Sequence, residues 1–342
     1  MRIWIDLWAA PDPLFFRPIV QRLHMLGHST WITAREFGET TAIAEQCGFL
    51  FSVVGRHGGR WIPGKIAANL SGAYRRAMIT RKMNIDLAVS FNSYSQGLAA
   101  KLLRIPFVTC MDYEYQPANH LAFRLASRVV VPRGFDRRAL RSQGGLPHKV
   151  VFFDGLKEHI AMVDFRPNTA YPRVLETLGI SHDDILVTMR PPASGATYHQ
   201  FENDLFGDAV EFLAQRQGVK VILLPRSKPQ ANWYLRVGSG NVIVPPAILD
   251  GPNLVYWSDL VVGGGGSMNR EAAVLGTRAY TVFRGRMAGV DEILISKGEL
   301  RVIDSREDLE QIRLVKRPRS VFRPTGNEAL AQVMQAIISA AP

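Results

Sequence analysis

The most constraining feature of the sequence is a regular alternation of β-rich and helical patterns. Short apolar or alternating runs predict strands, and segments with an apolar period near 3.6 residues predict helices. In the first half we expect strands at 2–7, 28–33, 49–54, 86–90, 106–111 and 128–131, and helices at 13–26, 36–47, 65–83, 95–103 and 118–126. Strands that alternate with helices form parallel sheets covered on both faces. The sequence therefore predicts a doubly wound α/β fold.

The alternation lapses once and then resumes, which predicts two Rossmann-like domains. A chain of 342 residues also exceeds the size at which one core keeps growing. The second series has expected strands at 185–189, 220–224, 242–244, 260–262, 279–282 and 300–303, and expected helices at 198–217, 230–237, 290–297, 306–314 and 327–340. We expect an N-terminal domain at 1–154, a linker at 155–172, a second domain at 173–325 and a C-terminal helix at 326–342.

Four consecutive glycines at 263–266 lie between the expected strand 260–262 and a helical pattern. The first N–H groups of a helix have no intrahelical partner, and the helix dipole favours an anion there. Glycines allow positive φ and a close approach of a diphosphate to the backbone. Ser267 is suited to cap the helix or to bind phosphate, and Glu271 is placed to accept hydrogen bonds from sugar hydroxyls. A glycine turn used only for packing is the alternative.

Two arginines follow other strands of the second series. Arg190 and Arg226 come where ligands bind in doubly wound sheets, beyond the carboxyl ends of strands. Guanidinium groups bind phosphate in a bidentate fork, although surface ion pairs are an equal alternative. The predicted nucleotide-sugar-binding residues are Gly264, Gly265, Gly266, Ser267, Arg270, Glu271, Arg190 and Arg226.

Acidic and polar residues follow the strands of the first half. The carboxylates Asp12, Asp112 and Glu114 are candidate catalytic acids or bases. For Asp112 and Glu114 the alternative is capping of the helix that begins near residue 118. Candidates on the acceptor side are Asp6, His57, Asn92, Ser93 and His120. No histidine pair has metal-ligand spacing, so we expect neither a metal nor a cofactor.

Positive charge is concentrated in the first half. The net charge is +11, and residues 1–155 hold 20 Lys and Arg against 10 Asp and Glu. No acidic residue lies between Glu45 and Asp86, a stretch that contains Arg56, Arg60, Lys65, Arg75, Arg76, Arg81 and Lys82. Such a surface attracts an anionic substrate, an anionic membrane or nucleic acid, or is merely a solvated face. Nucleic acid is disfavoured because only Trp61 and Tyr74 could stack with bases.

The helical period of 65–83 predicts which side chains face the sheet. Ile66, Leu70, Ala73 and Ala77 fall near one stripe, whereas Arg75, Arg76 and Lys82 lie off it and should point outward. The N-terminus lacks a signal-peptide pattern, and no apolar stretch reaches the roughly 20 residues that span a bilayer. We expect a cytoplasmic protein, with peripheral contact at the inner face of the membrane as an option.

Three segments resemble the DUF354 family of uncharacterised proteins: the glycine-rich turn with its helix, the Gly-Leu-Lys-Glu segment at 155–158, and Arg190-Pro191-Pro192. The resemblance covers nearly the whole chain. The family is similar to GT-B proteins, namely the UDP-N-acetylglucosamine 2-epimerases and the MurG-type glycosyltransferases. The resemblance implies two Rossmann-like domains that face each other across a cleft, with the C-terminal helix crossing back to the first domain.

The resemblance also implies roles for particular residues. The epimerase Ser-Gly-Gly turn corresponds to Gly265-Gly266-Ser267, and the ribose-binding glutamate corresponds to Glu271. Asp112 falls where the epimerases keep a catalytic acid. The epimerase His-Arg-Arg-Glu segment matches loosely, with Met189 in place of the histidine, and the glycine-rich first loop of MurG is absent.

These features predict a glycosyltransferase of GT-B type. A UDP-sugar would bind the second domain, and an anionic or lipid-linked acceptor would bind the basic first domain. A 2-epimerase acting at the same site is the alternative, and a noncatalytic sugar-nucleotide-binding protein is an alternative of another class.

Overall fold

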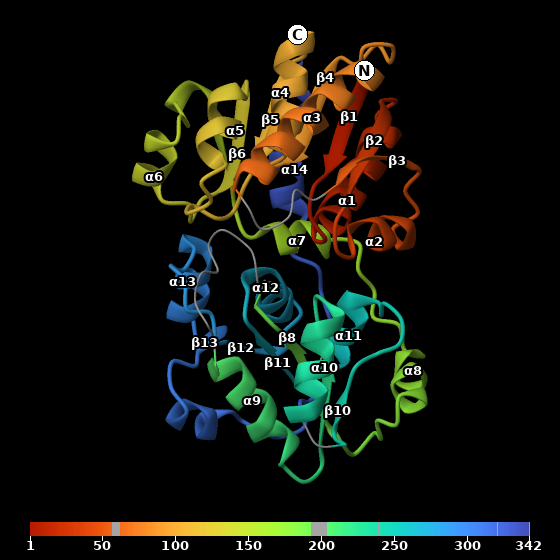
Figure 1. The fold of residues 1–342 in the computed structure, drawn as a ribbon, viewed down its shortest axis with the longest axis vertical. Coiled ribbons are helices and arrows are strands. Elements are labelled where there is room, and N and C mark those ends of the chain that lie inside the picture. Colours follow the sequence, from red (N-terminus) through yellow and green to blue (C-terminus); the bar gives the residue numbers. More distant parts are fainter. Residues whose placement is uncertain (57–61, 193–203, 238–239, 320, 342) are drawn as a thin grey trace. The chain divides into compact units, whose positions relative to one another are not determined.

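The computed structural model describes residues 1–56, 62–192, 204–237, 240–319 and 321–341. The chain divides into two compact units (Figure 1). The first unit comprises residues 1–164, 288–290 and 325–342, and the second comprises 165–287 and 291–324. The segment expected as a linker, 155–172, is therefore divided between the units.

The first unit contains a seven-stranded parallel sheet in the order β3-β2-β1-β4-β5-β6-β7. Its strands are β1 (Arg2–Leu7), β2 (Ser29–Glu36), β3 (Phe51–Arg56), β4 (Leu87–Phe91), β5 (Phe107–Cys110), β6 (Arg128–Pro132) and β7 (Val150–Phe153). The strand order reverses between β1 and β4, where Asp6 pairs with Ser90 in register. Ligands of doubly wound sheets bind at such a switch point.

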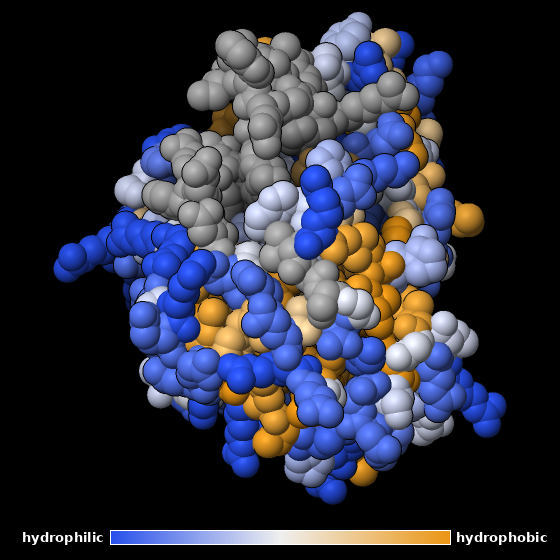
Figure 2. Space-filling view, turned by 60° about the horizontal axis from the view of Figure 1, so that its bottom comes forward, coloured by the Kyte–Doolittle hydropathy of each residue, from blue (hydrophilic) through white to orange (hydrophobic). Residues whose placement is uncertain are grey.

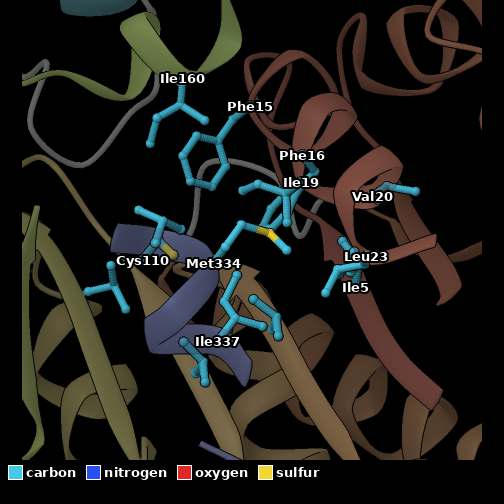
Figure 3. Close-up of a cluster of buried hydrophobic side chains, with 14 of the residues drawn as sticks. Ile5, Phe15, Phe16, Ile19, Val20, Leu23, Cys110, Ile160, Met334 and Ile337 are labelled. Atoms are coloured by element: carbon cyan, nitrogen blue, oxygen red, sulfur yellow. The ribbon is translucent and has the colours of Figure 1, made fainter. Parts of the chain in front are cut away.

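Helices cover both faces of this sheet because successive side chains of a strand point to opposite faces. They are α1 (Asp12–Met25), α2 (Thr40–Gln46), α3 (Ile62–Thr80), α4 (Tyr94–Leu103), α5 (Asn119–Leu125), α6 (Arg137–Ser142), α7 (Lys157–Ala161) and α14 (Asn327–Ile338). In β1, Ile5 packs with Phe15 of α1 and Ile337 of α14 (Figure 3). Its neighbour Trp4 packs on the other face with Ala77 of α3.

The second unit contains a six-stranded parallel sheet in the order β10-β9-β8-β11-β12-β13. Its strands are β8 (Ile185–Arg190), β9 (Val219–Leu223), β10 (Val242–Ile243), β11 (Leu260–Gly263), β12 (Arg278–Thr281) and β13 (Leu300–Val302). Its helices are α8 (Tyr171–Thr177), α9 (Asp204–Ala214), α10 (Lys228–Val237), α11 (Gly251–Trp257), α12 (Gly266–Val274) and α13 (Gly289–Ser296), of which α13 begins with two residues of the first unit. Two parallel sheets with interleaved helices confirm the predicted α/β fold class.

The sequence analysis missed several short elements. Strand β7 was not predicted. The sequence analysis also missed helices α6, α7, α8 and α11, because five to seven residues are too few to show a helical period. The expected helix at 306–314 is wrong, since the chain forms only a 3₁₀ helix at Glu307–Gln311. The expected helix at 198–217 is described from Asp204 onward, and its first residues lie outside the described part.

Helix α3 corrects the predicted direction of one arginine. Ala73 and Ala77 are buried as expected, but Leu70 is 58% exposed and Arg76 only 1% exposed. The side chain of Ile66 lies outside the described part. Arg76 faces inward because Asp6 of β1 provides a buried carboxylate for it. The exposed cations of this segment include Arg75, Arg81 and Lys82.

No helix among the described residues is both long enough and apolar enough to cross a membrane. On the face shown in Figure 2, hydrophilic residues are interspersed with patches of hydrophobic ones.

Candidate functional site

Polar side chains at the carboxyl end of β1 form a buried group centred on Asp6. The fully buried Asp6 carboxylate accepts hydrogen bonds from the hydroxyls of Thr33 and Ser93, both at 2.5 Å. The Nε of Arg76 lies 3.1 Å from Asp6 Oδ1. Three donors from β2, α3 and the start of α4 therefore hold this carboxylate, so Asp6 connects these elements at the switch point of the sheet.

Asp12, in the first turn of α1, has one engaged and one open carboxylate oxygen. Its Oδ2 accepts the backbone N–H groups of Trp8 at 2.7 Å and Ala9 at 2.9 Å. Among the described residues nothing donates to its Oδ1. Burial raises the pKa of Asp12 to about 7, although these N–H groups and the charge of Lys157 act in the opposite direction. A carboxylate with a pKa near neutrality is suited to general base catalysis.

Lys157, at the start of α7, lies between two buried carboxylates. Its ammonium donates to Asp112 after β5 and to Glu158 Oε1 at 2.6 Å. All three side chains are at most 8% exposed. Asp112 does not cap α5, since the N-cap of that helix is Ala118 and receives no side-chain hydrogen bond. The capping alternative for Asp112 is therefore wrong, and its oxygen is committed to an ion pair.

Sequence reasoning missed Lys157 as a functional candidate because it lies in the expected linker. The signal was present in the Gly-Leu-Lys-Glu segment, which places adjacent opposite charges directly after the strand ending at Phe153. A buried lysine favours the ionised form of the two carboxylates beside it, and it compensates part of their negative charge.

The Glu114 carboxylate is engaged by backbone groups. Its Oε1 accepts the N–H of Asp136, which caps α6, at 3.0 Å, and the N–H of Gly289 at 3.2 Å. Burial raises the pKa of Glu114. These bonds join α6 to the first residues of α13, so Glu114 is better placed to hold structure than to exchange protons.

The remaining candidates of the first unit are dispersed. Asn92 has left-handed backbone, with φ of 59°, and donates to Asn119 Oδ1 at 3.1 Å. Ser93 caps α4 in addition to binding Asp6. His120 is exposed on α5 and contacts Arg124, away from the Asp6 group. His57 lies outside the described residues. Among those described, no cluster of three or more His, Cys, Asp or Glu could hold a metal.

The glycine turn of the second unit connects β11 to α12, as predicted, and most of its glycines are also required by packing. None of the four has positive φ. A Cβ on Gly263 would lie 2.2 Å from Asn269 Oδ1, one on Gly264 2.4 Å from Pro192, and one on Gly266 2.7 Å from Arg270. These three glycines therefore permit close packing. Gly265 differs, since a Cβ there would meet only Arg226 Nη2, at 3.9 Å.

Helix α12 begins with Gly265 as its N-cap and has no side-chain cap. Ser267 is thus not the cap and instead lies in the first turn. The N-terminus of a helix favours an anion through its dipole and its first N–H groups. Glu271 follows one turn later and is 8% exposed.

The three predicted arginines of the second unit have different settings. Arg190 ends β8 in register with Gly263, and its carbonyl accepts the Gly264 N–H at 2.9 Å. Arg226 is exposed beyond β9, with its Nε 3.1 Å from the Pro191 carbonyl. Arg270 is buried and pairs with Asp291 at 3.0 Å, so its charge is already compensated. Arg190 and Arg226 thus adjoin the glycine turn at the carboxyl edge of the second sheet.

Comparisons with solved structures show a GT-B-like fold. The structure resembles the Methanocaldococcus jannaschii UDP-GlcNAc 2-epimerase in complex with UDP-GlcNAc and UDP, with a TM-score of 0.74, 15% identity and 99% of each chain covered. It also resembles the spinosyn rhamnosyltransferase SpnG, with a TM-score of 0.59, 14% identity and coverage of 99% of this chain and 94% of that one.

The family follows from sequence. The chain belongs to the family described as "Protein of unknown function (DUF354)", whose profile matches residues 1–333. An uncharacterized protein of Methanocaldococcus jannaschii is 29% identical over 318 residues, which is 92% of this chain and 90% of that protein. The predicted family and its GT-B likeness are thereby confirmed.

Proposed function

We propose that this protein is a nucleotide-sugar-dependent glycosyltransferase whose second unit binds a UDP-sugar. The observation that carries the proposal is the turn between β11 and α12. Of its four glycines, only Gly265 is not closely approached by side chains of the described residues, and Arg226 Nη2 lies 3.9 Å from the position of a Cβ there. A helix N-terminus and a guanidinium both favour a diphosphate. The complex of a structural neighbour with UDP-GlcNAc and UDP supports this choice of ligand.

The first unit would supply the base that activates an acceptor hydroxyl. A glycosyltransferase of this type needs one carboxylate that can take a proton. Asp12 fits best of the three predicted acids. Asp112 is paired with Lys157, and both oxygens of Glu114 accept backbone N–H groups, whereas the backbone N–H groups at Asp12 engage only Oδ2. The helix N-terminus of α12 would stabilise the departing diphosphate.

The glycine turn offers a matched pair of variants that tests the binding site. Gly265→Ala should leave the melting temperature unchanged, because its Cβ meets no atom within 3.4 Å, but should weaken UDP binding roughly tenfold by occupying the phosphate space. Gly264→Ala should instead cost about 1–3 kcal/mol of unfolding free energy through overlap with Pro192. Calorimetric titration and thermal melting measure both effects. Unchanged UDP affinity in Gly265→Ala would remove the site from this turn.

A 2-epimerase is the second candidate, and the buried acids favour it. Asp112 is ion-paired with Lys157, and the charge of Lys157 lowers the pKa of Asp12, so the first unit holds two buried acids under the influence of one cation. An epimerase needs acids and bases around both faces of one sugar ring, whereas a transferase needs an acceptor. Incubation with UDP-N-acetylglucosamine alone separates the two, since only an epimerase would convert it. Binding without turnover under any acceptor screen would leave the noncatalytic alternative.

The acceptor of the proposed transferase would be anionic or lipid-linked. Exposed cations Arg75, Arg81 and Lys82 lie at and just beyond the end of α3, beside the exposed apolar residues Tyr74 and Met78. Cations next to apolar side chains suit contact with an anionic membrane surface. Co-sedimentation with anionic but not neutral vesicles would support this peripheral contact, and equal recovery with both would oppose it.

A further inference from the structure

Arg35, near the end of β2, is a buried cation for which the described residues provide no ion-pair partner. It is 9% exposed, and its guanidinium carbon lies 3.7 Å from the ring centroid of Trp8 and 4.5 Å from that of Phe37. Its Nε is buried and has no hydrogen-bond partner, and among the described residues no carboxylate pairs with it. A buried charge is costly unless something compensates it.

Arg76 also lies near Trp8, with its guanidinium carbon 5.7 Å from the Trp8 ring centroid. Its Nε binds Asp6, whereas its Nη2 is buried without a partner. Asp6 cannot serve both arginines well, because it already accepts two hydroxyls and Arg76. Two guanidinium groups therefore carry unused donors beside a single saturated carboxylate.

The electrostatics agree with this geometry. Burial and the charge of Arg76 lower the pKa of Arg35 to about 10, against the opposing influence of Tyr94, Asp6 and Asp12. Neither Asp6 nor Asp12 forms an ion pair with Arg35, so compensation of its charge by these two carboxylates is incomplete. A stacked guanidinium is also held in a fixed orientation, which suits bidentate recognition of an oxyanion.

We propose that Arg35, held on Trp8 and assisted by Arg76, binds a phosphate or carboxylate group of the acceptor. This inference rests on the proposed function, because only a transferase has an acceptor. It assigns the oxyanion to that second substrate and not to the nucleotide sugar. Asp12 accepts the backbone N–H of Trp8, the residue whose ring contacts Arg35, so an acceptor anchored here would present its hydroxyl in the region of the proposed base.

The test uses inorganic phosphate and acetate as separate probes, titrated calorimetrically into the wild type, Arg35→Gln and Arg17→Gln. Arg17 is an exposed residue of α1, so its variant controls for the loss of one positive charge. Arg35→Gln should weaken binding of at least one probe by roughly 10- to 100-fold, because charge-assisted bonds are lost, while Arg17→Gln binds as the wild type. Whichever probe depends on Arg35 identifies the group as phosphate or carboxylate.

Two further measurements separate the possible failures. Phosphate could also occupy the glycine turn, so the titration is repeated in Gly265→Ala, where binding that depends on Arg35 should persist. UDP affinity should be equal in the wild type and Arg35→Gln. If the wild type does not bind UDP but its binding of phosphate or acetate depends on Arg35, the proposed function would be overturned and the Arg35 site would be retained.

The site itself has clear contrary results. Equal probe affinity in the wild type and Arg35→Gln, or no binding of either probe to the wild type, would overturn it. Arg35→Gln should stay folded with only a small loss of melting temperature relative to Arg17→Gln, because it loses the contact of the guanidinium with Trp8 but breaks no ion pair among the described residues. If Arg35→Gln fails to fold, Arg35→Lys, which keeps the charge but removes the fork, should show the weakened binding instead, and wild-type affinity in that variant would count against the site.

Discussion

Asp12→Asn is expected to lower kcat/KM by roughly two to four orders of magnitude while the protein stays folded. The amide oxygen of asparagine can still accept the N–H groups of Trp8 and Ala9, so the start of α1 should keep its geometry. What is lost is the ability of the open oxygen to take a proton. Steady-state kinetics after an acceptor has been found, with thermal melting in parallel, measure both effects.

The pH dependence gives this prediction a second readout. With a pKa of about 7, Asp12 should be an active base above that pH, so wild-type kcat/KM should rise as the pH passes through 7. Because the folded pKa lies above the unfolded value of 3.8, the folded state binds more protons between these values, and stability should fall as pH rises from about 4 to 7. Asp12→Asn should lack this fall. Asp164→Asn, at an exposed ion pair with Arg22, is the control and should resemble the wild type in both respects.

Full activity in Asp12→Asn would show that Asp12 is not the base and that another carboxylate has this role. The same experiment on Asp112→Asn then becomes decisive, since that residue occupies the position at which the resemblance to epimerases implies an acid.

Lys157→Met should cost about 3–5 kcal/mol of unfolding free energy, the largest stability effect expected in the chain. The substitution leaves Asp112 and Glu158 buried, at 8% and 2% side-chain exposure, without the cation between them. It should also raise the pKa of Asp12, since the charge of Lys157 lowers it, and thereby move the rise in activity to higher pH. Urea unfolding and a pH profile measure these two effects.

The double variant Lys157→Met/Asp112→Asn is the matched control for this ion pair. It removes one of the two stranded charges, so it should be more stable than Lys157→Met alone. If Lys157→Met unfolds at the urea concentration of the wild type, the three groups do not form a coupled buried cluster.

The elements that could be predicted from the sequence are those with one clear hydrophobic period along their length. Strand β1 alternates between two cores, with Ile3 and Ile5 on one face and Trp4 on the other, and its bounds agree with the expected range 2–7. Helix α7 has five residues and was read as part of a linker, although it carries the buried Lys157. Short elements of this kind are fixed by tertiary contacts that local patterns do not record.

The candidate site was predictable in its position and not in its pairings. Strand ends identified Asp6, Asp12 and Asp112 as residues of one sheet edge. Arg76 was predicted to point outward, because its partner Asp6 lies 70 positions away in the sequence. The position of the glycine turn was predicted correctly. Three of its glycines are required because a Cβ would overlap side chains such as those of Asn269 and Pro192, which only the folded unit brings near.

A crystal structure of the protein with UDP-N-acetylglucosamine would show directly whether the second unit binds a nucleotide sugar at the β11–α12 turn. We expect the diphosphate against the backbone N–H groups of Gly265, Gly266 and Ser267, with Arg226 beside it and the ribose hydroxyls at Glu271. A nucleotide bound away from this turn, or none bound at a ligand concentration that saturates in solution, would contradict this expectation.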